Sequence, residues 1–162
     1  MMTSNFKIIA YDSKYKQDFY DLNAAWIKQY FVMEDIDIKV LSDPQTHIID
    51  KGGDVFFALD GNKVFGTVAL KNQGNGKYEL TKLGVDPNVR SSGAGTALCK
   101  KAMEAYLSKE DRKTLFLESN TVLTGARRIY DRLGWIEKPL PANTPYERAN
   151  YYMEWQGPSP AF

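Results

Sequence analysis

The sequence predicts a single α+β domain with a mixed, mostly antiparallel sheet of about seven strands and about four helices. Three observations support this fold class. The chain has 162 residues, of which 43% are hydrophobic, enough to bury one core. Three apolar runs joined by short Gly/Asn turns predict an antiparallel meander, and strand and helix patterns then alternate. We expect one domain over residues 1–156 and a frayed tail over residues 157–162.

The first part of the chain carries one strand pattern and two helix patterns. The strand covers residues 6–10. Asp12 and Ser13 can cap a helix with apolar residues three or four positions apart, at Phe19, Leu22, Trp26 and Tyr30. Residues 42–44, with a proline at the third position, predict the start of a second, short helix that ends at the glycines of 52–53.

The remaining elements follow from turn residues and apolar periodicity. Strands at 55–59 and 64–70 are joined by Asp60-Gly61-Asn62, a hairpin signal. The later elements are a strand at 78–85, a helix at 97–109, a strand at 114–118, a helix at 124–133, and strands at 135–137 and 151–155. Gly134 stands where a helix commonly ends.

Composition excludes several classes of function. With 21 basic and 20 acidic residues, the net charge of +1 favours neither nucleic acid nor an anionic membrane. No apolar stretch approaches the ~20 residues of a membrane span, and the N-terminus lacks a signal-peptide pattern. The single cysteine, Cys99, excludes an internal disulfide and fits a reducing cytoplasm, where we expect the protein to be. His47 and Cys99 are too few to build a zinc site, so we expect no metal.

The loop between the strand at 78–85 and the helix at 97–109 is the most informative motif. It is rich in small residues, which leaves backbone N–H groups open to an anion at the positive end of a helix. A dinucleotide fingerprint would need Gly or Ala where Leu98 stands, and the Gly-Lys pair of a Walker loop is absent. The loop therefore predicts binding of some other phosphate compound.

The motif Arg90-x-x-Gly93-x-Gly95 resembles the acyl-CoA pyrophosphate loop of the GCN5-related N-acetyltransferases (GNAT). Residues 78–85 and 114–120 resemble the fourth and fifth strands of that family. Residues 126–135 resemble its A-x-x-x-Y-x-x-x-G-F segment, with Trp in place of the usual Phe. The resemblance covers roughly residues 55–138 and implies the GNAT fold, with its sheet splayed between strands four and five.

The resemblance implies where acetyl-CoA, the co-substrate, would bind. Its pantetheine arm would lie in the splay and hydrogen-bond the backbone of Leu83 and Val85, in the manner of an added strand. The N–H of Val85 could also polarise the thioester carbonyl. Arg90 and the backbone of the following loop would hold the pyrophosphate, namely Ser91, Ser92, Gly93, Ala94, Gly95 and Thr96. Alternatively, the glycines only form a tight turn.

The same resemblance implies three further site residues. Glu79 stands where some family members carry a general base, which an amine of pKa ~10.4 needs in order to attack. Alternatively, it is an exposed strand residue. Tyr130 matches the general acid that protonates the leaving thiolate; alternatively it is a core tyrosine. Asn120 matches a residue that bonds pantetheine or orders water, or else it caps the next helix.

The acceptor is less well specified by the sequence. An acidic trio, Glu34, Asp35 and Asp37, could attract a cationic amine, although a solvated acidic face is the simpler explanation. The acceptor class implied is a small-molecule amine or a protein or peptide amine. The family tendency to dimerise makes residues 151–155 a candidate homodimer interface, with core packing as the alternative.

We therefore expect direct transfer of acetyl from acetyl-CoA to a primary amine in a ternary complex, since no protein nucleophile is evident. Two alternatives remain open. One is an acyl-CoA-binding sensor or scaffold without turnover. The other is a transferase of a longer acyl or aminoacyl group.

Overall fold

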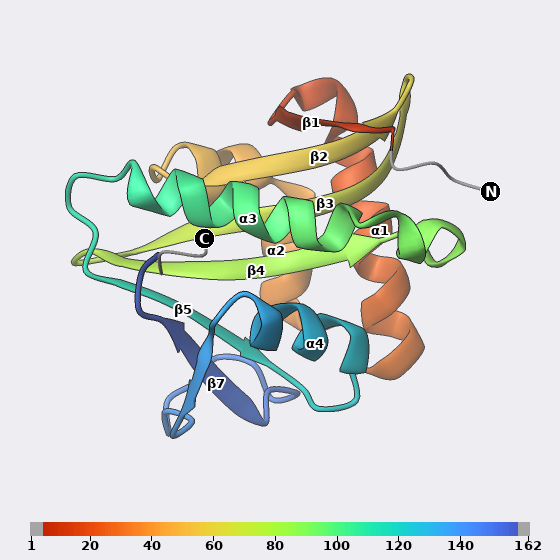
Figure 1. The fold of residues 1–162 in the computed structure, drawn as a ribbon. Helices are drawn as coiled ribbons and strands as arrows, with labels where there is room; N and C mark the ends of the chain where they lie inside the picture. Colours follow the sequence, from red (N-terminus) through yellow and green to blue (C-terminus); the bar gives the residue numbers. More distant parts are fainter. Residues whose placement is uncertain (1–4, 159–162) are drawn as a thin grey trace.

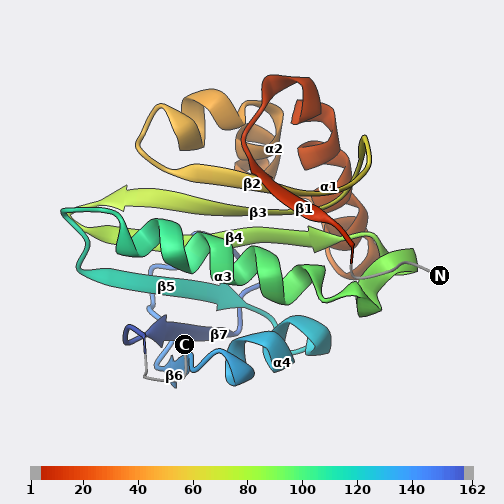
Figure 2. The same ribbon diagram turned by 45° about the horizontal axis from the view of Figure 1, so that its top comes forward.

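A computed structural model describes residues 5–158, except for the side chains of Arg90 and Ser91. Its seven-stranded sheet has the order β1-β2-β3-β4-β5-β7-β6 (Figures 1 and 2). The strands are β1 (Lys7–Ala10), β2 (Asp54–Asp60), β3 (Lys63–Gly74), β4 (Lys77–Val85), β5 (Thr114–Ser119), β6 (Ile136–Lys138) and β7 (Tyr151–Trp155). Only β4 and β5 pair in parallel, so the predicted mixed and mostly antiparallel sheet is confirmed.

Helices cover both faces of the sheet (Figure 2). One face packs against α1 (Lys16–Tyr30) and α2 (Asp35–Ser42), through a cluster that includes Phe19, Leu41 and Phe57. The other face packs against α3 (Ala94–Leu107) and α4 (Thr124–Arg132), through a cluster that includes Leu98 and Leu117. Short helical turns complete the chain, namely η1 (Ser13–Tyr15), η2 (Gln45–Ile49) and η3 (Pro87–Ser92).

Two helix predictions need correction. No helix is predicted over residues 35–42, but they form α2, because Glu34 and Asp37 build a capping box at its start. The second helix predicted after Ser42 is only the π-helical turn η2. Two short elements, α2 and η2, therefore lie between α1 and β2, where the sequence predicted one helix. The acidic residues that cap α2 also suit a loop.

The parallel pairing of β4 and β5 is short. It joins residues 77–79 to residues 114–116, and the strands then separate although both continue. The predicted splay between the fourth and fifth strands is thus confirmed. It leaves one edge of β4, from Leu80 to Val85, without a strand partner on the β5 side.

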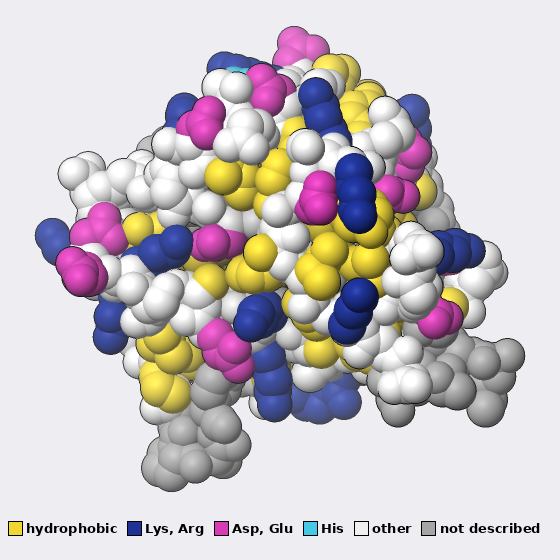
Figure 3. All heavy atoms as spheres, turned by 90° about the horizontal axis from the view of Figure 1, so that it is seen from above, with side chains coloured by type: hydrophobic (Ala, Val, Ile, Leu, Met, Phe, Trp, Pro, Cys, Tyr) yellow, Lys and Arg dark blue, Asp and Glu magenta, His cyan; other side chains and the backbone are white. Residues whose placement is uncertain are grey.

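Acidic and basic side chains are interspersed on the surface seen in Figure 3, as the near-neutral net charge suggests. Within residues 5–158 no helix combines the length and the hydropathy that a membrane crossing requires.

Candidate functional site

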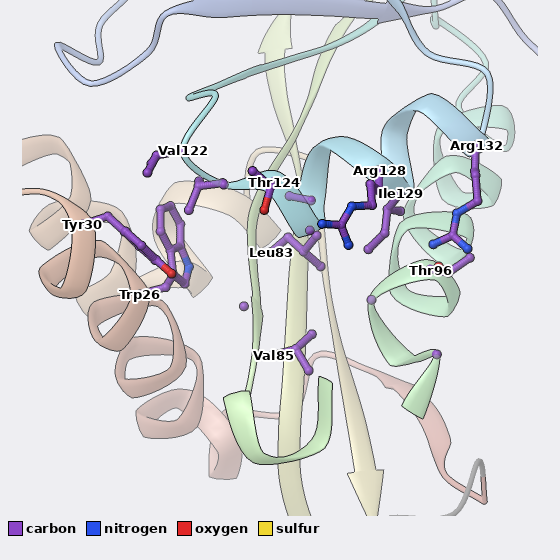
Figure 4. A pocket seen from close by; sticks show the side chains of 16 residues that line it. Trp26, Tyr30, Leu83, Val85, Thr96, Val122, Thr124, Arg128, Ile129 and Arg132 are labelled. Carbon is purple, nitrogen blue, oxygen red and sulfur yellow. The ribbon is translucent and has the colours of Figure 1, made fainter. Parts of the chain in front are cut away.

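A cleft of about 650 Å³ opens at the splay of the sheet. Its floor is the end of β4, where Leu83 and Val85 point into it (Figure 4). Trp26 and Tyr30 of α1 form one side, and the beginning of α3 together with one side of α4, from Thr124 to Arg132, forms the other. The cleft therefore joins helices that cover opposite faces of the sheet.

The floor of the cleft offers free backbone groups. Gly84 and Val85 pair with Thr67 and Gly66 of β3 on one side, whereas β5 has already diverged on the other. An extended ligand could hydrogen-bond this open edge as an added strand does. The structure thus brings the two predicted backbone positions, Leu83 and Val85, to the cleft.

The start of α3 provides N–H groups at one end of the cleft. Gly93 is the N-cap with φ +85°, a left-handed conformation that glycine adopts without strain. The N–H of Ala94 donates to Ser92 Oγ (3.3 Å), and the N–H of Ala97 makes the first helical bond, to Gly93 O (3.1 Å). The N–H groups of Gly95 and Thr96 precede that bond, so they have no helical acceptor. Both residues line the cleft.

The predicted loop residues therefore separate into different roles. Gly93, Gly95 and Thr96 line the cleft, whereas Ala94 is buried beneath them. Gly95 allows α3 to approach α4 closely, because a Cβ there would lie 2.9 Å from Ile129 Cδ1. The predicted roles of the Arg90 and Ser91 side chains fall outside the described part of the chain.

Two arginines that the sequence analysis missed point into the cleft. Arg128 and Arg132 lie one turn apart on α4, and Arg132 lies beside Thr96 at the start of α3 (Figure 4). Among the described residues neither makes an ion pair, whereas the adjacent Arg127 pairs with Asp131 and Glu137. Their four-residue spacing on the predicted helix was the signal that could have found them.

The opposite side of the cleft is aromatic and apolar. Tyr30 is 39% exposed and Val122, after β5, is 48% exposed. Helical periodicity places Trp26 and Tyr30 on the apolar face of α1, and both line the cleft. The described lining of the cleft contains no Asp or Glu.

Glu79 lies where the pairing of β4 and β5 ends, opposite Phe116. It is buried, so the alternative of an exposed strand residue is wrong. Its Oε1 accepts a bond from Gln73 Nε2 (2.7 Å), and burial raises the pKa of its carboxyl despite the nearby Lys82 and Lys71. The side chain is outside the cleft lining, at the closed end of the splay.

Tyr130 is buried on α4, with its ring 6.1 Å from that of Trp135. Burial raises the pKa of its phenol well above the usual value of 10, so the hydroxyl keeps its proton. Tyr130 stands one turn after Ala126, which lines the cleft, but is not itself part of the lining. Its role as general acid stays a prediction.

The prediction for Asn120 needs correction. Its Nδ2 donates to Arg148 O (2.8 Å), and its Oδ1 accepts from Val122 N–H (2.9 Å). The amide is therefore engaged at both ends, and it is absent from the cleft lining. It fastens the loop after β5 to the loop before β7. It does not cap α4 either, whose N-cap is Leu123.

The acidic trio also needs correction, because two of its members are neutralised. Asp37 is fully buried and pairs with Lys82 (2.9 Å) and Arg148 (2.6 Å). Burial alone would raise its pKa, but these two cations hold it at about 2. Glu34 pairs with Arg148 as well (3.2 Å), and only Asp35 is exposed. The sequence could not show the distant cations that pair with this trio.

Comparisons with known proteins agree with this geometry. The family model described as "Acetyltransferase (GNAT) family" matches residues 11–135. An uncharacterised N-acetyltransferase from Methanocaldococcus jannaschii is 40% identical over 62 residues, which are 38% of this chain but only 27% of that protein.

Solved structures share the fold at low identity. A GNAT-family acetyltransferase from Staphylococcus aureus has a TM-score of 0.82 at 20% identity, over 92% of this chain and 97% of that one. YncA of Salmonella typhimurium, crystallised with its cofactor acetyl-CoA, has a TM-score of 0.73 at 14% identity, over 94% of each chain. A variant of the spermidine N-acetyltransferase SpeG from Vibrio cholerae has a TM-score of 0.70 at 15% identity, also over 94% of each.

Proposed function

Because this chain belongs to the acetyltransferase (GNAT) family, we propose that it transfers an acetyl group from acetyl-CoA directly to a primary amine in a ternary complex. The observation that carries the proposal is the cleft at the splay. It combines an open strand edge with a helix N-terminus and two arginines that make no ion pair within the described part of the chain. The acetyl-CoA bound to YncA supports the choice of donor.

The lining fits the chemistry of this donor. The N–H groups of Gly95 and Thr96 and the guanidinium groups of Arg128 and Arg132 suit an anionic pyrophosphate. The open edge of β4 suits the amides of an extended pantetheine arm. The N–H of Val85 is then available to polarise the thioester carbonyl.

Proton transfer is assigned to two buried groups. An amine of pKa ~10.4 arrives protonated and must lose a proton before it attacks. Glu79, at the closed end of the splay, accepts that proton through a water molecule, since its carboxyl lies outside the cleft lining. Tyr130, whose phenol is protonated, donates a proton to the leaving thiolate.

The amine side of the cleft carries Trp26, Tyr30 and Val122 and no carboxylate. SpeG acts on spermidine, but the lining described here offers no anionic group to select a polycation. We therefore expect the primary amine, rather than added positive charge, to be the common feature of good acceptors.

The test is release of CoA thiol from acetyl-CoA over a chemically diverse panel of amines. The panel pairs monoamines with diamines and polyamines of matched length, and mass spectrometry identifies the acetylated product. Turnover above hydrolysis with at least one amine supports the proposal. Tight acetyl-CoA binding with no acetylated amine would instead indicate a sensor, and faster turnover with a longer acyl-CoA would indicate a different donor.

A further inference from the structure

A bulge in β4 sets the orientation of the cleft floor. Thr81 pairs with Ala69 and Gly84 pairs with Thr67, so Lys82 and Leu83 together face the single residue Val68. Lys82 has φ +57°, a left-handed conformation that is usually taken by glycine at such bulges. A lysine in this conformation needs something to hold it there.

The bulge reverses the alternation of side chains along β4. Before it, Tyr78 and Leu80 belong to the core under α3 and α4. After it, Leu83 and Val85 pack on that same core and line the cleft. Without the extra residue, strict alternation would turn Leu83 and Val85 toward α1. Gly84 now faces α1 so closely that a Cβ there would lie 3.2 Å from Leu22 O. Without the bulge, position 84 would face the other side of the sheet.

The side chain of Lys82 is anchored in a buried ion cluster. The side chain is only 2% exposed, and its Nζ lies 2.9 Å from Asp37 Oδ1 and 3.4 Å from Tyr146 Oη. Nζ also lies 4.8 Å from the centre of the Tyr146 ring. The anchor itself is fixed, because Arg148 binds both carboxylate oxygens of Asp37 (2.6 and 2.7 Å).

Arg148 extends this cluster to a third part of the chain. It comes from the loop before β7 and pairs with Glu34 at the start of α2. Its guanidinium lies 4.9 Å from the ring centre of Tyr146 and 5.6 Å from that of Trp26. The cluster thus joins α2, β4 and the β7 loop directly behind the cleft wall that Trp26 forms.

We infer that Lys82 is a positioning residue: its ion pair with Asp37, held in turn by Arg148, keeps the left-handed bulge that turns Leu83 and Val85 into the cleft. Burial of the Lys82 ammonium is tolerated only because the Asp37 carboxylate compensates its charge. The tether then opposes relaxation of the lysine backbone to an ordinary strand conformation. The consequence for acetyl-CoA binding rests on the proposed function.

Two substitutions separate the backbone conformation from the charge. Lys82→Met and Lys82→Gly both remove the ammonium and leave Asp37 paired with Arg148. Glycine adopts φ +57° freely, whereas methionine does not. We expect Lys82→Met to weaken acetyl-CoA binding at least tenfold by titration calorimetry. Lys82→Gly should stay within about threefold of the unaltered protein, although its melting temperature falls.

A mainly structural role would produce a different order. If stability alone mattered, Lys82→Gly would be the worse variant, because it also removes the buried aliphatic stem. Equal affinity of the two variants, whether unchanged or equally reduced, would overturn the inference. If Lys82→Met fails to fold, the acetyl-CoA affinity of Lys82→Asn is compared with that of Lys82→Gly instead, since asparagine tolerates the left-handed region. It should then bind acetyl-CoA as Lys82→Gly does, and a tenfold loss would overturn the inference.

A crystal structure of Lys82→Met gives a readout that needs no ligand. We expect residue 82 to leave the left-handed region and Leu83 to change direction. Retention of a positive φ would overturn the inference even if acetyl-CoA does not bind. Failure of the unaltered protein to bind acetyl-CoA would count against the proposed function instead.

Discussion

At the scale of single residues, Glu79 and Tyr130 share one property, which is burial of an ionisable group. Burial favours the uncharged form, so it raises the pKa of both side chains. A phenol that stays protonated can donate a proton, and a carboxyl of raised pKa accepts one more readily. The shift makes Glu79 a stronger base, whereas it keeps Tyr130 protonated and makes its phenol a weaker acid.

Replacing Tyr130 by Phe should lower kcat by about 10²-fold, the usual effect of losing an acid–base group. Acetyl-CoA affinity should stay within about twofold, because the phenol is outside the cleft lining. Steady-state kinetics and calorimetry measure the two quantities. Tyr106→Phe is the matched control, since Tyr106 is equally buried on α3. An unchanged kcat in Tyr130→Phe would remove Tyr130 from the mechanism.

Replacing Glu79 by Gln should lower kcat by about 10²-fold and change the pH profile. A base works only when deprotonated, so kcat/KM of the unaltered protein should rise with pH through the folded-state pKa of Glu79. That pKa is above the ordinary value of 4.5. The rise should vanish in Glu79→Gln when kcat/KM is measured from pH 5 to pH 9.

Glu118 is the comparison for Glu79, because it is the other carboxylate whose charge acts on Glu79. It already accepts a hydrogen bond from the Thr144 hydroxyl. If the rise with pH persists in Glu79→Gln and disappears in Glu118→Gln, the base is Glu118.

At the scale of elements, the N-terminus of α3 and the side of α4 that faces it carry the groups suited to an anion. The glycines there act for different physical reasons. Gly93 is needed for its left-handed backbone, with φ +85°. Lack of space is not the reason, because a Cβ there would meet no atom within 4 Å. Gly95 is needed for the close approach of Ile129.

Gly93→Ala should weaken acetyl-CoA binding about tenfold and lower the free energy of unfolding by about 1–2 kcal/mol. Gly61→Ala is the matched control. Gly61 has φ +60°, open space around its Cβ position and a place in the turn between β2 and β3, away from the cleft lining. It should lose similar stability with no change in affinity. Equal affinity losses in calorimetry would mean that strain, rather than the loop at the cleft, weakens binding.

Arg128→Ala and Arg132→Ala should each weaken acetyl-CoA binding about tenfold, with a smaller dependence on salt, since each removes one charge from the phosphate end. Arg127→Ala lies on the same helix but removes the ion pairs with Asp131 and Glu137 and the contact with the Tyr151 ring (4.8 Å), and none of these partners lines the cleft. It should leave the affinity unchanged. Binding of S-acetylpantetheine, which lacks the pyrophosphate, should respond to none of the three. If an arginine variant changes the affinity for S-acetylpantetheine, the arginine contacts a part of the donor other than the pyrophosphate.

At the scale of the whole molecule, the splay connects the two faces of the sheet. Trp26 of α1 and Ile129 of α4 line one cleft, although their helices lie on opposite faces. This arrangement fits the proposal that the donor binds from the side of α3 and α4 while the amine approaches from the side of α1 and α2. The Asp37–Lys82–Arg148 cluster stands behind this passage and joins three distant segments.

Acetyl-CoA at about 100 times its Kd should stabilise the folded protein by about 2.7 kcal/mol. For a domain of this size the melting temperature should rise by roughly 5–10 °C in a calorimetric scan. Backbone hydrogen exchange should slow at the open edge of β4 and at the start of α3. ATP at the same concentration is the control for a merely anionic ligand, and an equal shift with ATP would argue against a specific site.

The sequence alone predicted the strands, most of the helices and five residues that the structure brings to the cleft, namely Leu83, Val85, Gly93, Gly95 and Thr96. These features depend on local signals, namely apolar periodicity and the small residues before α3. Turn glycines such as Gly134 belong to the same class. The capping box of α2 was also local, but its acidic residues suit a loop equally well, so that helix was missed.

Only the tertiary structure decided which charges are free. Asp37 meets Lys82, 45 positions away, and Arg148, 111 positions away, which turns a predicted acidic attraction into a buried ion cluster. Asn120 is likewise taken up by the backbone of Arg148. Long-range pairing of this kind depends on how strands are ordered in the sheet. The periodicity of one segment carries no information about the partner that another segment brings to it.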